Sequence, residues 1–114
     1  MKQITVVGFP FQVRVVAPNE LGEGYCYTHS GLHKPLEGEI LLNRQGTQDA
    51  RRETFLHEVL HAVCDAGGIE KDAENGMDTR EWKAFTRIAY AVLKDNGFLD
   101  IQAIDKMLEE ADGK

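Results

Sequence analysis

The segment His57-Glu58-Val59-Leu60-His61 has residue types and a spacing suited to metal chemistry. On a helix, residues four apart lie one turn above each other, so the two imidazoles can bind one metal ion. Imidazoles with one carboxylate favour Zn²⁺, which keeps one position for water at a catalytic site. Glu58 is rotated by about 100° from His57 on a helix. We therefore predict His57 and His61 as metal ligands and Glu58 as the general base for the metal-bound water.

A site of this kind needs a third protein ligand, and Glu81 is the best candidate. In a helix that starts near residue 78, Glu81 lies four residues before Phe85 and seven before Ile88, on the apolar face. A carboxylate on an inward face is costly unless a cation meets it. The pattern therefore predicts Glu81 as the third ligand.

Other interpretations of the nearby side chains stay open. Asp78 and Glu81 have the spacing of a capping box, in which the glutamate only reaches back to the helix start. A carboxylate within residues 70–78 is the remaining alternative. Cys64 lies on the same helix face as His57 but about 10 Å further along the axis, so we interpret it as a small buried hydrophobe.

His29 and His33 are also four residues apart, but their surroundings differ. Gly31 and Pro35 predict a strand end and a loop there, where this spacing does not bring two rings together. We interpret both histidines as solvent-exposed loop residues, with the alternative that one of them lines the site and donates to a substrate oxygen.

The elements that position these side chains fall into a strand-like front and a helical back, divided near residue 46. Alternating or short apolar runs predict strands over residues 4–7, 11–16, 25–29 and 39–43, the first two antiparallel. The run 39–43 is either an exposed edge strand or an internal strand with Ile40 and Leu42 in the core.

Helical periodicity begins after Thr47, a predicted N-cap, and continues to Gly67-Gly68. A second helix is predicted from Asp78 or Thr79 to Asn96-Gly97, and a third, serving only in packing, from Asp100 to about Ala111. The sequence thus predicts a single α+β domain over residues 1–114. Its three- to four-stranded, mostly antiparallel sheet packs on the H-E-x-x-H helix and two further helices.

Composition excludes several classes of protein. The chain has 114 residues and a formal net charge of -6, which argues against a nucleic-acid partner because phosphate binding needs clustered Lys and Arg. No run approaches the roughly 20 apolar residues of a membrane span, and the first residues break too soon for a secretory signal. We therefore expect no membrane partner and a cytoplasmic location, with both cysteines, Cys26 and Cys64, as thiols.

The pattern of His57, Glu58 and His61, followed by Glu81, resembles the zinc-binding pattern of the gluzincin metallopeptidases, the thermolysin-like group. In size and layout the chain is similar to the minimal gluzincin-like proteins of bacteriophages and prophages, related to the ImmA/IrrE-type peptidases. The resemblance covers roughly residues 1–97. One departure is Phe85, which stands where thermolysin-like enzymes have an aspartate that orients a histidine. The residue that stabilises the oxyanion stays open among Tyr25, Tyr27, His29, Arg80 and Tyr90.

The resemblance implies a zinc metallopeptidase that hydrolyses peptide bonds, with Glu58 passing a proton from water to the leaving amine. A peptide or protein substrate could add to an edge strand by backbone hydrogen bonding. A chain this short lacks the second lobe of larger zinc proteases, so we expect a restricted substrate range, with a protein partner, an oligomer or a missing upstream domain completing the cleft. The alternative functions are a zinc-binding interaction module without turnover, such as a viral accessory protein, and an α+β domain without metal.

Overall fold

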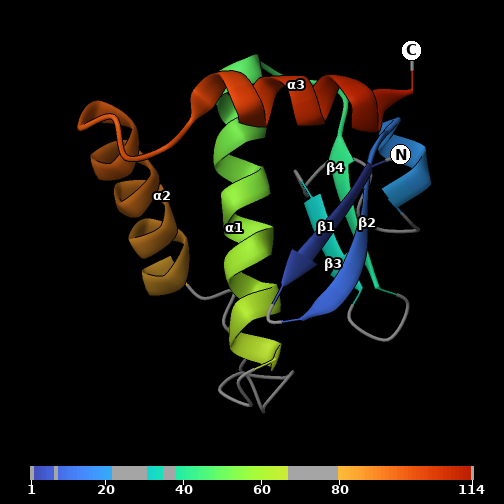
Figure 1. The fold of residues 1–114 in the computed structure, drawn as a ribbon, viewed down its shortest axis with the longest axis horizontal. Coiled ribbons are helices and arrows are strands. Elements are labelled where there is room, and N and C mark those ends of the chain that lie inside the picture. The colour runs from blue at the N-terminus through green and yellow to red at the C-terminus, as the bar shows by residue number, and fades with distance from the viewer. Residues whose placement is uncertain (1, 7, 22–30, 35–37, 67–79, 114) are drawn as a thin grey trace.

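A computed structural model describes residues 2–6, 8–21, 31–34, 38–66 and 80–113 (Figure 1). A four-stranded sheet lies against α1 and α3, and α2 packs on α1 away from the sheet. The elements in chain order are β1 (Lys2–Val6), β2 (Phe9–Val16), a 3-10 turn (Pro18–Leu21), β3 (Gly31–Lys34), β4 (Glu39–Asn43), α1 (Gln48–Ala66), α2 (Arg80–Asp95) and α3 (Ile101–Asp112).

The sheet is mixed, with the strand order β1-β2-β4-β3. β1 and β2 pair antiparallel, with Ile4 opposite Phe11, so the predicted pairing of the first two strands is confirmed. β2 and β4 are parallel, and β4 and β3 are antiparallel. Two of these three pairings are antiparallel, which confirms the predicted α+β class with a mostly antiparallel sheet.

β4 is an internal strand, so of the two alternatives that the sequence leaves open for residues 39–43 the internal strand is confirmed and the exposed edge is not. Ile40 and Leu42 are completely buried in the main core, while Leu41 on the opposite face packs with Val16 and Leu21. An uninterrupted apolar run is typical of a strand that is buried on both faces. Among the described strands, the two edges of the sheet are β1 and β3.

β3 occupies residues that the sequence assigns to a loop. Gly31–Lys34 pair antiparallel with β4, and His33 lies opposite Ile40. His33 is therefore a strand residue, and its prediction as a loop residue is wrong. Strand formation in so short a segment depends on the partner strand more than on its own propensity. The strand predicted over residues 25–29, including His29, lies outside the described residues.

The helix boundaries agree with the predicted caps where the structure describes them. The backbone N–H of Ala50 donates to Thr47 Oγ1 at 3.1 Å, which confirms the N-cap of α1. The N–H of Ala103 donates to Asp100 Oδ1 at 3.0 Å, and Gly113 ends α3 with a φ of 71°. The predicted start of α2 at residues 78 or 79 lies outside the described residues.

α3 has the packing role expected of it. Its buried residues Leu108 and Ala111 join the main core against β2 and β1, together with Ala62 of α1. The other buried members of this cluster are Val6, Phe11, Val13, Val15, Ile40 and Leu42. No helix within the described residues is long and apolar enough to cross a membrane.

Replacing Leu42 with alanine should destabilise the fold by about 2–5 kcal/mol, because the shortened side chain leaves a cavity in a close-packed core. Urea unfolding followed by circular dichroism measures this loss. Phe9→Ala is the control, since Phe9 is 60% exposed and should change the free energy of unfolding by less than about 1 kcal/mol. A Leu42→Ala protein as stable as the wild type would contradict the internal position of β4.

Arg52 joins α1 to α3 through a two-pronged ion pair with Asp105, with N···O distances of 2.7 and 2.6 Å. The hydrogen bonds from Arg52 lower the pKa of Asp105 below its ordinary value. A lowered folded-state pKa contributes stability above the unfolded value near pH 4, which is lost as the pH falls through the folded value. Asp105→Asn should therefore lower stability at pH 7 and reduce its loss between pH 4 and pH 2. Urea unfolding of the wild-type and Asp105→Asn proteins at pH 4 and pH 2 measures both free energies. A variant whose stability falls as steeply with acid as that of the wild type would contradict the role of the pair.

Candidate metal centre

The H-E-x-x-H segment lies within α1, as its spacing predicts. His57 and His61 occupy the same face, one turn apart, with ring centroids 4.7 Å apart and ring planes at 75°. Their Nε2 atoms converge to 3.1 Å. α1 thus brings the same nitrogen of each ring to one point.

Thr86 of α2 contacts the Nδ1 atom of His57. Thr86 Oγ1 lies 2.8 Å from His57 Nδ1, and its hydroxyl donates to the backbone carbonyl of Lys83 at 3.1 Å. With this proton on the Lys83 carbonyl, Thr86 Oγ1 accepts from His57 Nδ1–H, and in that tautomer of the neutral imidazole Nε2 of His57 carries a lone pair.

His61 receives a hydrogen bond from the single tryptophan of the chain. The indole Nε1–H of Trp82 in α2 donates to His61 Nε2 at 3.1 Å. An indole N–H only donates, so Nε2 of His61 also carries a lone pair. Trp82 in turn stacks on Phe85, with ring centroids 5.7 Å apart.

These bonds make the two imidazoles suitable ligands for a zinc ion. The two Nε2 atoms lie 3.1 Å apart, at hydrogen-bonding distance, and a shared cation can take the place of the proton that one tautomer puts between them. A tetrahedral Zn²⁺ with bonds of about 2.0–2.1 Å holds two ligand nitrogens about 3.3 Å apart. The separation of His57 Nε2 and His61 Nε2 therefore fits joint binding of a metal ion, which would compete with the Trp82 N–H for His61.

Glu58 lies between the two histidines in α1 and is only 7% exposed. Burial of a carboxylate is costly, so its presence here favours a role that needs the charge. Because Glu58 directly follows His57 in the helix, its side chain points about 100° around the helix axis from that of His57. This is the position that the sequence predicts for a general base.

Glu81 does not occupy the inward position expected of a third ligand. Its side chain is exposed in the first turn of α2, and Trp82 is directed at His61 instead. Within the described ranges, no group of three or more His, Cys, Asp and Glu lies close enough to hold a metal ion. Ligation by Glu81 therefore stays a prediction, and residues 70–78 are not described.

The other side chains considered for the site are Cys64 and those that could stabilise the oxyanion. Tyr90 is buried, and its hydroxyl donates to Asp49 Oδ1 at 2.7 Å, at the contact of α2 with α1. Burial and this hydrogen bond raise the pKa of Tyr90 to about 12. Arg80 is exposed, and Cys64 is half-buried. Tyr25, Tyr27 and His29 lie outside the described residues.

Sequence reasoning did not predict Trp82 and Thr86 at this site. Both lie on α2, four residues apart, so they share a face and can reach two histidines that are also four apart. That matching spacing was the available signal. It is weak without knowledge of how α2 is rotated against α1.

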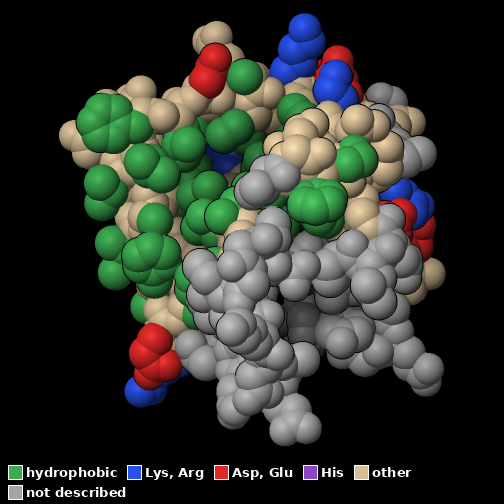
Figure 2. All heavy atoms as spheres, turned by 60° about the horizontal axis from the view of Figure 1, so that its bottom comes forward, with side chains coloured by type: hydrophobic (Ala, Val, Ile, Leu, Met, Phe, Trp, Pro, Cys, Tyr) green, Lys and Arg blue, Asp and Glu red, His purple; other side chains and the backbone are tan. Residues whose placement is uncertain are grey.

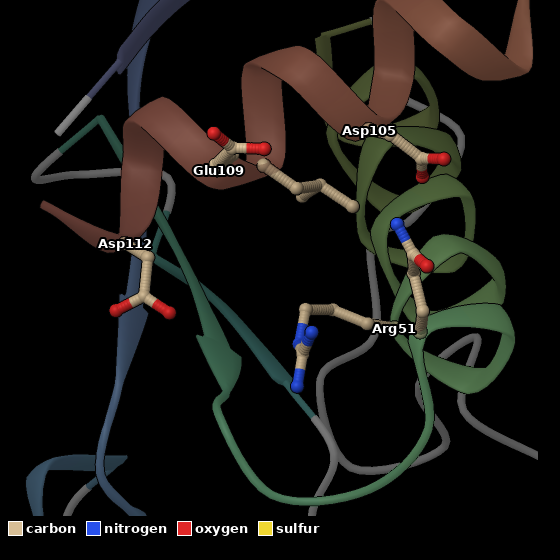
Figure 3. A pocket seen from close by; sticks show the side chains of 6 residues that line it. Arg51, Asp105, Glu109 and Asp112 are labelled. Atoms are coloured by element: carbon tan, nitrogen blue, oxygen red, sulfur yellow. The ribbon is translucent and has the colours of Figure 1, made fainter. Parts of the chain in front are cut away.

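A separate cavity of about 320 Å³ lies between α1 and α3, near the start of α1 (Figure 3). Two of its labelled carboxylates are already paired, Asp105 with Arg52 and Asp112 with Arg44. The lining residues are Gln48, Arg51, Asp105, Leu108, Glu109 and Asp112. None of them belongs to the H-E-x-x-H segment, so this cavity is not the candidate metal centre.

A small α+β domain that presents an H-E-x-x-H helix beside a mixed sheet is a zincin-like domain. The model of the IrrE N-terminal-like domain family, Peptidase_M78, matches residues 11–109, and the chain belongs to this family. Its function is therefore peptidase-related, in a family that is generally metal-dependent. Comparison with curated proteins finds no match, and neither does comparison with solved structures.

Proposed function

We propose that this protein is a zinc-dependent metallopeptidase with a restricted substrate range. His57 and His61 hold the zinc ion, and Glu81 completes the ligand set. The observation that carries the proposal is the convergence of the two histidine Nε2 atoms to 3.1 Å on one face of α1. Membership of a peptidase family supports the reaction class.

A bound zinc ion supplies a Lewis acid that polarises the scissile carbonyl and makes water a better nucleophile near neutral pH. Glu58 accepts the proton of the attacking water and delivers it to the nitrogen of the leaving amine. Thr86, 2.8 Å from His57 Nδ1, orients the ring so that its Nε2 atom faces the site. Proton transfer and ligand orientation are thus assigned to separate side chains.

Both described edge strands, β1 and β3, contact the motif helix α1, and β3 does so more extensively. An extended peptide can add to an edge strand through backbone hydrogen bonds, which bind many sequences weakly. We propose that the substrate lies along β3, replacing the role that the sequence assigned to residues 39–43. Specificity then depends on side-chain pockets.

The test of the proposed function combines metal analysis with a cleavage assay. Protein purified without added zinc should contain close to one zinc ion per chain by atomic emission, and should cleave a protein substrate captured with the Glu58→Gln variant. Zinc without cleavage of any captured protein would favour an interaction module without turnover. Absence of bound metal at neutral pH would refute the proposal.

A further inference from the structure

α2 presents an apolar stripe to solvent. Phe85, Ile88 and Val92 are 58%, 62% and 51% exposed and follow one another at a spacing of three and four residues. Thr86 and Tyr90, on the opposite face of the helix, are buried. Figure 2 shows hydrophobic side chains gathered on this side of the molecule, at the left of the view. A surface helix ordinarily turns its apolar stripe toward the core, so an exposed stripe is typical of a surface that another molecule covers.

Two small residues lie beside this stripe. Ala84 and Ala91 are exposed on the same side of α2, each one position before a member of the stripe. We call Phe85, Ile88 and Val92, together with these two alanines, the outer face of α2. Apolar side chains at a three-four spacing are the pattern along which two helices interlock, and small neighbours let the backbones approach closely. The outer face therefore fits a helix that carries anchors at the same spacing.

A row of basic side chains borders the outer face on one flank. Its members, all exposed except the half-buried Lys94, are Arg80, Lys83, Arg87 and Lys94. Arg87 also pairs with Glu53 of α1 at 3.2 Å, and Lys94 pairs with Asp49 at 3.1 Å. The Arg87 side chain nevertheless stays 76% exposed, and exposed ion pairs contribute little stability, so a partner carboxylate can share this guanidinium. The row therefore favours a partner with acidic side chains along the facing flank.

Two other occupants fit the outer face less well. The stripe ends in a carboxylate in both directions, at Glu81 and Asp95, each seven residues from Ile88. Two copies of α2 paired about Ile88, parallel or antiparallel, would place carboxylate opposite carboxylate, which weakens an interface. An anionic lipid surface would attract the basic row. The whole chain has a formal net charge of -6 although α2 itself has more basic than acidic residues, so the remainder of the chain is repelled from such a surface.

We propose that the outer face of α2 binds an amphipathic helix of another protein, with acidic side chains along the flank that meets the basic row. The apolar stripe of that helix covers Phe85, Ile88 and Val92 and removes them from water. This inference depends on neither metal binding nor peptide cleavage.

A helix docked on the outer face lies close to the candidate metal centre. Trp82 stacks on Phe85 with ring centroids 5.7 Å apart, and its indole N–H donates to His61 Nε2 at 3.1 Å. A helix that covers Phe85 therefore reaches the histidine pair through two side chains. Because Trp82 is the only tryptophan, its fluorescence reports docking without an activity measurement.

The probe is a synthetic helical peptide of about 18 residues without tryptophan, with leucines along one face and glutamates along one flank. A matched peptide carries lysines in place of the glutamates. Titration into the full chain should change the emission of Trp82, and the glutamate peptide should bind at least tenfold more tightly than the lysine peptide in about 0.1 M salt. Equal affinity for the two peptides, or binding of neither, would overturn the proposal.

Two substitutions on α2 separate the apolar from the charged contribution. Ile88→Asp should weaken binding of the glutamate peptide more than tenfold, whereas Phe9→Asp, on β2 where the ring is 60% exposed, should leave it unchanged. Arg87→Glu should narrow the difference between the two peptides at least threefold. Circular dichroism checks that these exposed substitutions leave the fold intact. Binding by a folded Ile88→Asp protein as tight as by the wild type would overturn the proposal.

Sedimentation of the protein alone and its binding to vesicles test the two other occupants. The wild type should sediment as a monomer, and it should bind phosphatidylcholine vesicles with about one-fifth phosphatidylserine more weakly than it binds the glutamate peptide. A dimer that Ile88→Asp abolishes would assign the outer face to a second copy and overturn the proposal. Tighter binding to the vesicles than to the peptide would assign the face to lipid, with the same consequence.

Discussion

Replacing Glu58 with glutamine should lower the rate of peptide cleavage by about 10²–10⁴-fold, the usual contribution of a general acid–base group. The amide cannot accept a proton from the attacking water, whereas its shape and burial match those of the carboxylate. Zinc content should remain that of the wild type, because the side chain is not assigned as a ligand. Single-turnover cleavage of a captured substrate, with zinc measured on the same sample, tests both expectations.

Glu53→Gln is the matched control for this experiment. Glu53 lies on the same helix, one turn before His57, where its carboxylate pairs with Arg87 at 3.2 Å and has no assigned role in the reaction. This substitution should leave the cleavage rate within about twofold of the wild type. Equal cleavage by the Glu58→Gln and wild-type proteins would remove Glu58 as the base and require another proton acceptor.

Replacing His61 with alanine should weaken zinc binding by more than 100-fold, and His57→Ala should do the same. Loss of a partner that only orients a ligand already costs about 10–100-fold in metal affinity, and loss of the ligand itself must cost more. Calorimetric titration with zinc in a buffer that does not bind the metal measures the change. Circular dichroism of the same samples separates loss of the site from loss of the fold.

His33→Ala serves as the control for the two histidine variants. His33 lies in β3, opposite Ile40, and is not assigned as a ligand. Its substitution should change zinc affinity less than that of either motif histidine. A larger loss of affinity in His33→Ala would place the metal between α1 and β3 instead of at the H-E-x-x-H pair.

Much of the fold can be predicted from local sequence patterns, namely hydrophobic alternation and helix caps. The alternation of Phe11, Val13 and Val15 predicts a half-buried strand, and all three are buried in β2. The caps at Thr47 and Asp100 mark the starts of α1 and α3 because their side chains satisfy backbone N–H groups within one turn. Such signals act over a few residues, so they can be interpreted without knowledge of the tertiary structure.

The places where sequence reasoning failed depend on partners that are distant in the chain. Residues 39–43 were equally compatible with an edge strand and an internal one, and the pairing of β4 with both β2 and β3 decides between them. Gly31–Lys34 become a strand because β4 offers a free edge. The inward face of α2 was predicted from hydrophobicity, yet Thr86 and Tyr90 face inward because they bond to His57 and Asp49.

The sequence by itself determined the pair of imidazoles and the carboxylate between them, since a helix of 3.6 residues per turn must align residues four apart. It also determined the helices and most of the sheet, through caps and hydrophobic periods. Only the tertiary structure decided which side chains meet those imidazoles, because the rotation of α2 against α1 depends on contacts between segments more than 20 residues apart. It brought Thr86 and Trp82 to the histidines and left Glu81 on the outer face.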